Sequence, residues 1–503
     1  MAPAPQQEAS RKLNVVESAV VAPWPIPPVP ETSLPLTFFD VFWLNFPPVE
    51  RVFFYHLVPG PGAATTATIL SNLKTSLAQA LRAFYPLAGR LRLRPGTTDR
   101  HELHYQPGDG VTFTVAMYDL DVDELALDEP REVAKIAQLV PPLPDGGAVL
   151  ALQATVLRGG RGLSVGMALH HAACDGACST HFLHTWAAAS AGAVAPAPPV
   201  IDRTLVKDPS GLCDAFIRAM ASTEKKDYVK MPGDKLLATF TLSIEDIQRI
   251  KDVVLLAAAG KAGAPPRCSS LVATFGFIWS CHQRAKDDKA SNGGGGDPTY
   301  FIFPVDHRSR MEPAPIPDEY LGNCVGAALQ GAPKDRLAMP GAVGLVTACT
   351  AVAAAIEQAV GVGSIRSPEL WWERIREAIL SGGGVLTVAG SPKFRVYDVD
   401  FGFGQPAKVE IVSVARTGAL AVAESRRSSG GIEVGISLPA DAMRRFQCCF
   451  HDAIAWLQCT TPSSGRLMHT SMPMGARDGV DWSLERTCSS INMPIPYLHH
   501  PVW

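Results

Sequence analysis

The sequence predicts an α/β protein built from two domains. The chain has 503 residues, which is longer than a single hydrophobic core normally supports. Hydrophobic residues make up 47 % of the chain and charged residues 18 %, a balance typical of a globular protein with a large core and not of a disordered one. Patterns typical of helices and patterns typical of strands occur in both halves of the chain, and this mixture predicts the fold class.

The first half contains one clear helix pattern and one clear strand pattern. Apolar residues at three- and four-residue steps predict a core-facing helix: Ile69, Leu70, Leu73, Leu77, Leu81 and Phe84. The segment 162–171, "GLSVGMALHH", alternates with a period of two and predicts a strand that carries His170 and His171 at its C-terminal end. We therefore expect both histidines at the mouth of a strand.

A change of composition separates the two halves. After Thr185 the periodicity is lost and Pro, Ala and Gly become frequent, as in a linker. We predict an N-terminal domain over residues 1–205, a crossover linker over 206–230 and a C-terminal domain over 231–458. The segment 459–503 has weak periodicity and many Pro, Ser, Met and His residues, so we expect an irregular tail.

The second half again mixes strands and helices. It predicts a strand over 235–243, "KLLATFTLS", a capped helix over 243–260 and a second helix over 269–286. The glycine-rich segment 287–298 predicts a surface loop. The segment 430–458 predicts a strand, a proline break and an amphipathic final helix.

The net charge, the N-terminus and the cysteines indicate which binding partners and which cellular compartment to expect for the protein. The net charge is -3 with no basic stripe, so we expect no nucleic-acid partner. The N-terminus lacks the apolar core of a secretory signal, and the most apolar window, 341–356, is shorter than a bilayer span, so we expect a buried helix and no membrane. The 11 cysteines form no CxxC pair, and Cys174 and Cys178 match no common zinc spacing, which favours reduced thiols in the cytoplasm and no metal site.

The motif "HHAACD" at residues 170–175 contains a histidine that could act as a general base and an aspartate that could hold the loop around it. A histidine at a strand end has the near-neutral pKa needed to accept a proton from a hydroxyl or an amine, which makes His171 the candidate base. Asp175 precedes Gly176, where the chain can turn sharply. Taken alone, the pattern also fits a core histidine followed by a turn or N-cap aspartate.

Four motifs together resemble those of the plant BAHD acyl-CoA-dependent acyltransferases. They are "HHAACDG" at 170–176, "DFGFG" at 400–404, "FYPLAGRL" at 84–91 and the segment 305–324 that ends in "YLGNC". Their order and spacing are similar to those of the family over residues 12–458. The resemblance implies two chloramphenicol-acetyltransferase-like α/β domains, with an active-site channel at their interface and the histidine near its middle.

The same resemblance assigns roles to individual residues. His171 is implied to be the general base that deprotonates an acceptor hydroxyl, which then attacks the thioester carbonyl of an acyl-CoA without a covalent acyl-enzyme. Asp175, the other member of the catalytic motif, is implied to be structural and to pair with an arginine of "DHRSR", for which we favour Arg308 over Arg310. Acyl-CoA is then a co-substrate, and no permanently bound cofactor is implied. The sequence does not identify the group that stabilises the oxyanion.

The motif "DFGFG" has a second reading. In protein kinases a DFG aspartate holds magnesium, but no glycine-rich nucleotide loop, VAIK-like strand or HRD segment precedes it here. In the resembling family this motif supports the fold and the CoA-binding end, so Asp400, Gly402 and Gly404 are expected to be structural. Phe403 replaces the usual tryptophan, and we expect aromatic packing to remain while any indole hydrogen bond is lost.

Further segments resemble the clade that transfers malonyl and related groups to flavonoid, anthocyanin and phenolic glucosides. "LPLTFFDVFWL" at 34–44, "RVFFYHL" at 51–57 and "YLGNC" at 320–324 are similar to segments of that clade, and Asn323 is expected to contact substrate. A malonyl donor carries a free carboxylate that needs a cation or several hydrogen-bond donors. Ala177 departs from the clade, in which the residue after "DG" is often basic.

Several alternatives remain open at the level of sequence. The enzyme could use an aromatic or another aliphatic acyl-CoA, on a different alcohol or amine. "HHxxxDG" also occurs in peptide-synthetase condensation domains, but "DFGFG" and "YLGNC" favour a free CoA donor. A non-catalytic binding relative would tolerate loss of the base, whereas His171 and Asp175 are both present. The resemblance implies a small-molecule phenolic acceptor and a monomer.

Overall fold

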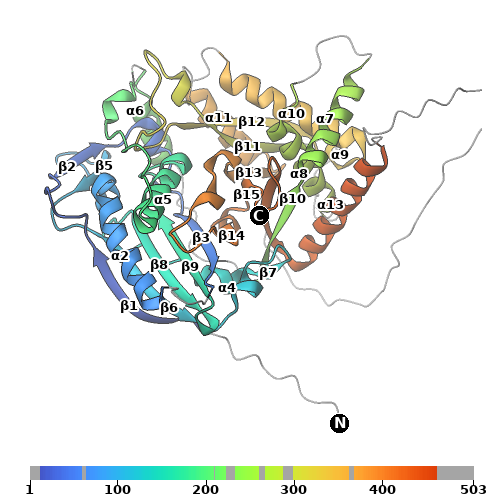
Figure 1. The fold of residues 1–503 in the computed structure, drawn as a ribbon. Coiled ribbons are helices and arrows are strands. Elements are labelled where there is room, and N and C mark those ends of the chain that lie inside the picture. Colours follow the sequence, from blue (N-terminus) through green and yellow to red (C-terminus); the bar gives the residue numbers. More distant parts are fainter. Residues whose placement is uncertain are drawn as a thin grey trace, which may run out of the picture. The chain divides into compact units, whose positions relative to one another are not determined.

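The structure is built around two large mixed β-sheets (Figure 1). It is a computed structural model that describes residues 12–58, 64–208, 210–221, 231, 233–259, 267–286, 298–361 and 368–460. The six-stranded sheet has the order β1 (Asn14–Val21), β6 (Val111–Tyr118), β8 (Leu150–Leu157), β9 (Gly162–Leu169), β3 (Val49–His56) and β14 (Lys408–Ile411).

The second large sheet comes mainly from the C-terminal half. Its seven strands are β12 (Val325–Pro333), β11 (Pro298–Asp306), β13 (Val385–Gly390), β15 (Leu420–Glu424), β16 (Ile432–Pro439), β10 (Lys235–Leu242) and β7 (Arg131–Glu132). A small sheet of β2 (Thr32–Pro35), β5 (His101–Tyr105) and β4 (Arg90–Leu93) lies in the N-terminal half. The predicted α/β class is confirmed.

The two halves of the chain exchange strands. β14 pairs antiparallel with β3 at one edge of the six-stranded sheet, with Lys408 opposite Phe54. In return, β7 pairs antiparallel with β10 at one edge of the seven-stranded sheet. The chain up to Thr461 forms one compact unit, and the domain boundaries predicted at 205 and 231 stay a prediction.

Helices cover these sheets, as Figure 1 shows for α2 and α5 beside β8 and β9. The helices are α1 (Phe38–Val41), α2 (Thr66–Ala83), α3 (Val122–Leu125), α4 (Val133–Ala137), α5 (Gly176–Ala191), α6 (Leu212–Ala221), α7 (Ile244–Ala258), α8 (Ser270–Ala285), α9 (Lys334–Ala338), α10 (Ala342–Val360), α11 (Pro368–Leu380), α12 (Val414–Thr417) and α13 (Ala440–Thr460). The helices predicted at 69–84, 243–260 and 269–286 and after the proline break are confirmed as α2, α7, α8 and α13.

Local sequence explains where these elements begin. Thr65 caps α2 by accepting a hydrogen bond from the Thr68 N–H, and Ser243 begins α7 with a capping box that includes Asp246. The strand predicted over 162–171 is confirmed over 162–169 as β9, with His170 and His171 just beyond its end, and all eight residues of β9 are buried. Its period-two pattern therefore does not mark an exposed face, because both faces of this central strand are covered.

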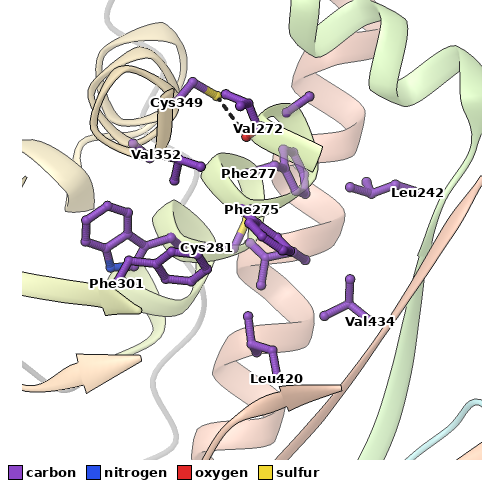
Figure 2. Packing of buried hydrophobic residues seen from close by; sticks show 14 of the residues in the cluster. Leu242, Val272, Phe275, Phe277, Cys281, Phe301, Cys349, Val352, Leu420 and Val434 are labelled. Carbon is purple, nitrogen blue, oxygen red and sulfur yellow. Dashed lines mark hydrogen bonds between the residues drawn. The ribbon is translucent and has the colours of Figure 1, made fainter. Parts of the chain in front are cut away.

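The core of the second half packs α8 against the seven-stranded sheet (Figure 2). Phe275 of α8 lies 5.4 Å from Phe301 of β11, measured between ring centroids. Cys349 of α10 donates a hydrogen bond to the Val272 carbonyl of α8 at 3.7 Å. In the described part of the chain, only α10 is long and apolar enough to cross a membrane by length and composition. One of its faces, which includes Leu345 and Cys349, is buried in this core, as predicted for the window 341–356.

Two predicted segments are only partly described. Helix α6 lies inside the predicted linker 206–230, so part of that segment is regular structure and not extended chain. The predicted glycine-rich loop at 287–298 lies outside the described residues except for Pro298, which begins β11. The predicted tail 459–503 lies outside them from residue 461 onward, and Thr460 ends α13.

Candidate active site

His171 lies directly beyond the end of β9. The backbone N–H of His170 donates to the Val149 carbonyl at 2.8 Å, which extends the pairing of β8 and β9 to the end of the strand. The chain then turns at residues 171–173 and enters α5, whose N-cap is Asp175. The sheet therefore holds the His171 loop at the mouth of a strand, as the sequence predicts.

Asp175 is a buried carboxylate with three partners. One oxygen, Oδ1, accepts the Cys178 N–H of the first turn of α5 at 3.1 Å, which caps the helix. The other, Oδ2, accepts the Cys324 N–H at 3.0 Å and Nη2 of Arg308 at 2.8 Å. The predicted pairing with Arg308 is thus present, and Arg310 instead donates to a backbone carbonyl at the surface.

The partners of Asp175 show that the two large sheets meet at this site. Arg308 and Cys324 both lie in the connection between β11 and β12 of the seven-stranded sheet. Asp175 follows β9 of the six-stranded sheet. The Asp175–Arg308 ion pair therefore joins the base-bearing loop to the other sheet. Both side chains are almost completely buried, so water screens this pair little.

A second buried carboxylate, Asp40, supports the other side of the loop. Its Oδ2 accepts hydrogen bonds from the backbone N–H and hydroxyl of Thr37 and from Nη1 of Arg203. Its Oδ1 accepts the backbone N–H and the side-chain Nδ2 of Asn323 at 3.0 and 2.9 Å. The same Nδ2 donates to the His171 carbonyl at 2.9 Å, so Asp40 and Asn323 together fix the backbone of the base.

Trp43 covers one face of the His171 ring. The two ring centroids are 3.7 Å apart and the planes are inclined by 12°, which is a stacked arrangement. Trp43 follows α1, the short helix that contains Asp40. An aromatic face attracts cations, so this stack favours the imidazolium that forms when His171 accepts a proton.

Burial sets the protonation state of the base. It lowers the pKa of His171 below the ordinary value of 6.5, while its own backbone carbonyl, Asp175, Asn323 and Asp40 act in the opposite direction. The imidazole is therefore neutral at neutral pH and has a lone pair with which to accept a proton. The loop thus presents a neutral general base where the two sheets meet.

Asn323 does not fit the predicted role of contacting substrate. Its side chain is completely buried, and its Nδ2 is engaged by Asp40 and by the His171 carbonyl. Sequence similarity places it in "YLGNC" but does not show that this loop folds beneath the base. We therefore correct the prediction: Asn323 is a positioning residue for His171.

This correction leads to a kinetic prediction. We expect Asn323→Ala to lower kcat by at least about tenfold, with KM for donor and acceptor nearly unchanged. It removes the hydrogen bonds of Nδ2 to Asp40 and to the His171 carbonyl, and each buried hydrogen bond is typically worth ~1–3 kcal/mol. Steady-state kinetics with each substrate varied in turn measure the two constants separately. A raised KM with an unchanged kcat would restore the substrate-contact role. Asn72→Ala, in which an exposed asparagine bonded to Ser190 is removed, is the control.

Asp400 organises a turn. Its Oδ1 accepts the backbone N–H groups of Gly402 at 2.8 Å and Gly404 at 2.9 Å. Both glycines have positive φ, 97° and 110°, which side-chain-bearing residues rarely adopt. A Cβ on Gly402 would lie only 3.1 Å from Cα of Ala191 at the end of α5. The geometry agrees with the structural role expected for these three residues.

The aromatic residues of "DFGFG" pack on the N-terminal half. Phe401 is buried, with its ring centroid 4.7 Å from that of Trp186 in α5. Phe403, for which the resemblance implies a tryptophan, makes an edge contact with Tyr55 of β3 at 5.0 Å between ring centroids. The aromatic packing expected for Phe403 is therefore present.

Three supporting residues, Asp40, Trp43 and Arg203, were not predicted from the sequence. Asp40 and Trp43 lie in "LPLTFFDVFWL", which carried part of the resemblance, so a family signal was present without a role. Arg203 gave no signal, because it lies in a segment without periodicity. In the structure it is buried, pairs with Asp40 at 2.9 Å and donates to the Ala173 carbonyl.

No metal-binding arrangement of three or more His, Cys, Asp or Glu side chains is found among the described residues. Cys174 and Cys178, which follow the histidines, are buried thiols. A hydrogen bond with Cys178 and burial raise the pKa of the Cys174 thiol well above its ordinary value.

Known proteins share this sequence pattern along most of the chain. The model of the Transferase family matches residues 11–452. An Arabidopsis thaliana malonyl-CoA:anthocyanidin 5-O-glucoside-6''-O-malonyltransferase is 32 % identical over 87 % of this chain and 97 % of its own length. Phenolic glucoside malonyltransferase 1 of the same species has the same identity and coverage. A coumaroyl-CoA:anthocyanidin 3-O-glucoside-6''-O-coumaroyltransferase, also from Arabidopsis, is 29 % identical over 88 % of this chain and 97 % of its own length.

Solved structures share the fold. Vinorine Synthase superposes with a TM-score of 0.63 at 19 % identity, covering 86 % of this chain and 96 % of that one. A Fusarium graminearum protein solved with coenzyme A and deoxynivalenol superposes with a TM-score of 0.57 at 16 % identity, covering 83 % of this chain and 97 % of that one. The predicted two-domain, chloramphenicol-acetyltransferase-like architecture is confirmed. With its fold, its HxxxD site and the match over residues 11–452, the chain belongs to the Transferase family, that of the plant BAHD acyl-CoA-dependent acyltransferases.

Proposed function

We propose that this BAHD acyltransferase moves a malonyl group from malonyl-CoA to a hydroxyl of a phenolic or flavonoid glucoside. The support for the glucoside and for malonyl is the set of relatives at 31–32 % identity whose names state that activity. The observation that carries the chemistry is the neutral His171, held through its backbone by Asn323 and Asp40.

In the proposed reaction, His171 accepts the proton of the acceptor hydroxyl as the oxygen attacks the thioester carbonyl. The new C–O bond forms as the carbonyl becomes a tetrahedral oxyanion. When the C–S bond breaks, the imidazolium returns its proton to the CoA sulfur, and ester and free CoA result. Asp175 contributes through the Arg308 pair and the cap of α5, which fix the loop that carries the base.

Aromatic acyl donors are the second candidate. Two relatives at 29 % identity are named as coumaroyltransferases acting on anthocyanidin glucosides, so a similar chain can use an aromatic acyl-CoA on the same class of acceptor. The acceptor class is therefore common to both candidates. The donor is what has to be measured.

A donor panel tests the proposal. Purified protein is given malonyl-, acetyl- or coumaroyl-CoA with a set of phenolic and flavonoid glucosides and their aglycones, and products are followed by mass spectrometry and by release of free CoA. We expect kcat/KM to be highest for malonyl-CoA, by at least about tenfold (~1.4 kcal/mol), with esters formed on glucosides and not on aglycones. Faster transfer of coumaroyl, or transfer to aglycones alone, would contradict the proposal.

A further inference from the structure

The imidazole of His171 is not oriented by a carboxylate. In many catalytic sites a carboxylate accepts a hydrogen bond from the ring of the base and so fixes its direction. Here the oxygens of Asp175 accept hydrogen bonds from Arg308 and from the backbone N–H groups of Cys178 and Cys324. Nδ1 of His171 is buried and has no hydrogen-bond partner in the described part of the chain. A contact of another kind therefore has to hold the ring.

The indole of Trp43 makes that contact. The two rings stack with 3.7 Å between their centroids and 12° between their planes. The indole itself packs against two further rings, since Phe42 lies edge-on at 4.8 Å and Phe46 at 5.0 Å between ring centroids. A ring fixed in this way restrains the plane of the imidazole that stacks on it. Because Nδ1 of His171 is buried, Nε2 is the nitrogen left to face an acceptor hydroxyl.

The face of the indole, and not its N–H group, is what this position uses. Nε1 of Trp43 is buried and has no hydrogen-bond partner among the described residues. Burying an N–H group without a partner costs free energy, so hydrogen bonding does not explain an indole here. The face, by contrast, lies directly on the base. An aromatic side chain without an N–H group should therefore serve in its place.

The same short stretch of chain also holds the backbone of the base. The backbone N–H of Trp43 donates to the Asp40 carbonyl at 3.0 Å, so the two residues share one turn. The Asp40 carboxylate binds the side chain of Asn323, which in turn donates to the His171 carbonyl. Arg203 pairs with the same carboxylate at 2.9 Å and ties this turn to the rest of the molecule. One turn therefore holds both the backbone and the ring of the base.

We infer that Trp43 is the positioning residue of the imidazole: its face directs the ring towards the acceptor hydroxyl and stabilises the imidazolium that forms during transfer. The inference rests on His171 acting as the base of the proposed acyl transfer. A neutral imidazole gains less from an aromatic face than an imidazolium does, so the contact is stronger in the transition state than in the ground state. Burial increases this difference, because less water competes for the charge.

The charged groups near the base stay in place when the indole is replaced. Asp175 and Asp40 both favour the imidazolium, and each is held in a buried ion pair, with Arg308 and with Arg203 respectively. Burial lowers the pKa of the adjacent His170 to about 4, so this ring is neutral where the base titrates near its ordinary range. A change in the pKa of the base on replacing the indole therefore reports the stack itself.

The first test measures the pKa of His171 by NMR in protein with isotope-labelled histidine, where its resonance is the one that His171→Ala lacks. Trp43→Leu keeps an apolar cover on the ring but removes the aromatic face, so we expect the pKa to fall by about one pH unit. Trp43→Phe keeps a face without the N–H group and should restore at least half of that loss. Trp24→Leu, which replaces an exposed tryptophan, is the matched control and should leave the pKa unchanged.

The second test measures kinetics with malonyl-CoA and one glucoside. We expect Trp43→Leu to lower kcat by about tenfold, which corresponds to one pH unit in the pKa of the base. KM for donor and acceptor should change by less than about threefold, because the indole acts on the base and not on the bound substrates. Trp43→Phe should retain most of the wild-type kcat. Circular dichroism checks the folding of each variant, and Trp43→Met replaces Trp43→Leu if the latter is not folded.

Three results overturn the inference. Equal losses in Trp43→Leu and Trp43→Phe would show that the N–H group matters and not the face. A pKa of His171 that rises towards 6.5 in Trp43→Leu would show that the indole only excludes water. A raised KM for the acceptor with an unchanged kcat would make Trp43 a substrate contact.

The NMR titration separates the inference from the proposed function, because it needs no substrate. If wild type malonylates no glucoside but the pKa of His171 falls in Trp43→Leu and recovers in Trp43→Phe, the proposed function fails and the effect of the stack on the base stands. If wild type malonylates glucosides but the pKa is the same in all three proteins, the proposed function stands and the inference is overturned.

Discussion

His171→Ala abolishes acyl transfer while the protein stays folded: this is the expected result, with kcat/KM lowered by about 10²–10⁴-fold. Removing a positioned general base typically has an effect of this size. The fold should survive because the ring makes one stacking contact, with Trp43, whereas the loop itself is held through backbone atoms. Turnover of purified protein, with circular dichroism as the check on folding, measures both effects.

The neighbouring histidine provides the control. Nδ1 of His170 accepts the Ala172 N–H at 3.2 Å, and burial lowers the pKa of His170 to about 4, so it is neutral and structural. His170→Asn provides an oxygen that can accept the same N–H, and it should retain most of the activity. Near wild-type turnover by His171→Ala would exclude this residue as the base.

The same base fixes the expected pH profile. Only neutral imidazole accepts a proton, and the pKa of His171 is below 6.5. We therefore expect kcat/KM of wild type to decrease on the acidic side with a midpoint shifted below the ordinary imidazole value of 6.5. A midpoint above 6.5 would contradict this assignment of the protonation state.

Asp175→Asn has the second large effect, on stability as well as on activity. It leaves the buried Arg308 guanidinium without its main counter-charge, and removing one partner of a buried ion pair typically costs ~3–5 kcal/mol. The remaining partner, Asp306, is half-exposed and lies 3.3 Å away. We expect the melting temperature to fall by several degrees and the activity to fall with it, because the displaced arginine distorts the base-bearing loop.

Removing the whole ion pair separates this explanation from a direct catalytic role. Asp175→Asn combined with Arg308→Met has no unpaired buried charge, so it should regain part of the lost melting temperature, as a double-mutant cycle would show. His171→Ala should not share the loss of stability. If Asp175→Asn left the melting temperature unchanged and shifted only the pH profile, the aspartate would act on the reaction directly.

The fold was predictable where the sequence is periodic. The stripe from Ile69 to Phe84 predicts α2, and the alternation in 162–169 predicts β9. The two strands that each half of the chain adds to the other half's sheet show no periodic pattern, because β14 has four residues and β7 has two. So few residues cannot show a period. Their pairing is decided by tertiary contacts that no local pattern encodes.

Of the contacts that hold the His171 loop, only the Asp175–Arg308 ion pair was predictable from the sequence. The Asp175–Arg308 pair followed from motif similarity, and the structure contains it. Asn323 was assigned to substrate because sequence shows which residue is in a loop but not which way the loop faces. Asp40 and Trp43 reach His171 from more than a hundred residues earlier in the chain. A contact over such a separation leaves no trace in the spacing of residues along a single sequence.

The late strand β14 has a consequence for how the protein is made in the cell. Glu50 at the start of β3 and Ser413 just after β14 are 363 residues apart and hydrogen-bonded. At ~5–20 residues per second, a ribosome needs about 20–70 seconds to produce the second after the first. During that time β3 presents an open edge with Phe53 and Phe54, which is a template for pairing with other chains. With 503 − 413 = 90 residues left to translate once Ser413 is made, this edge of β3 stays unpaired until about the last fifth of translation.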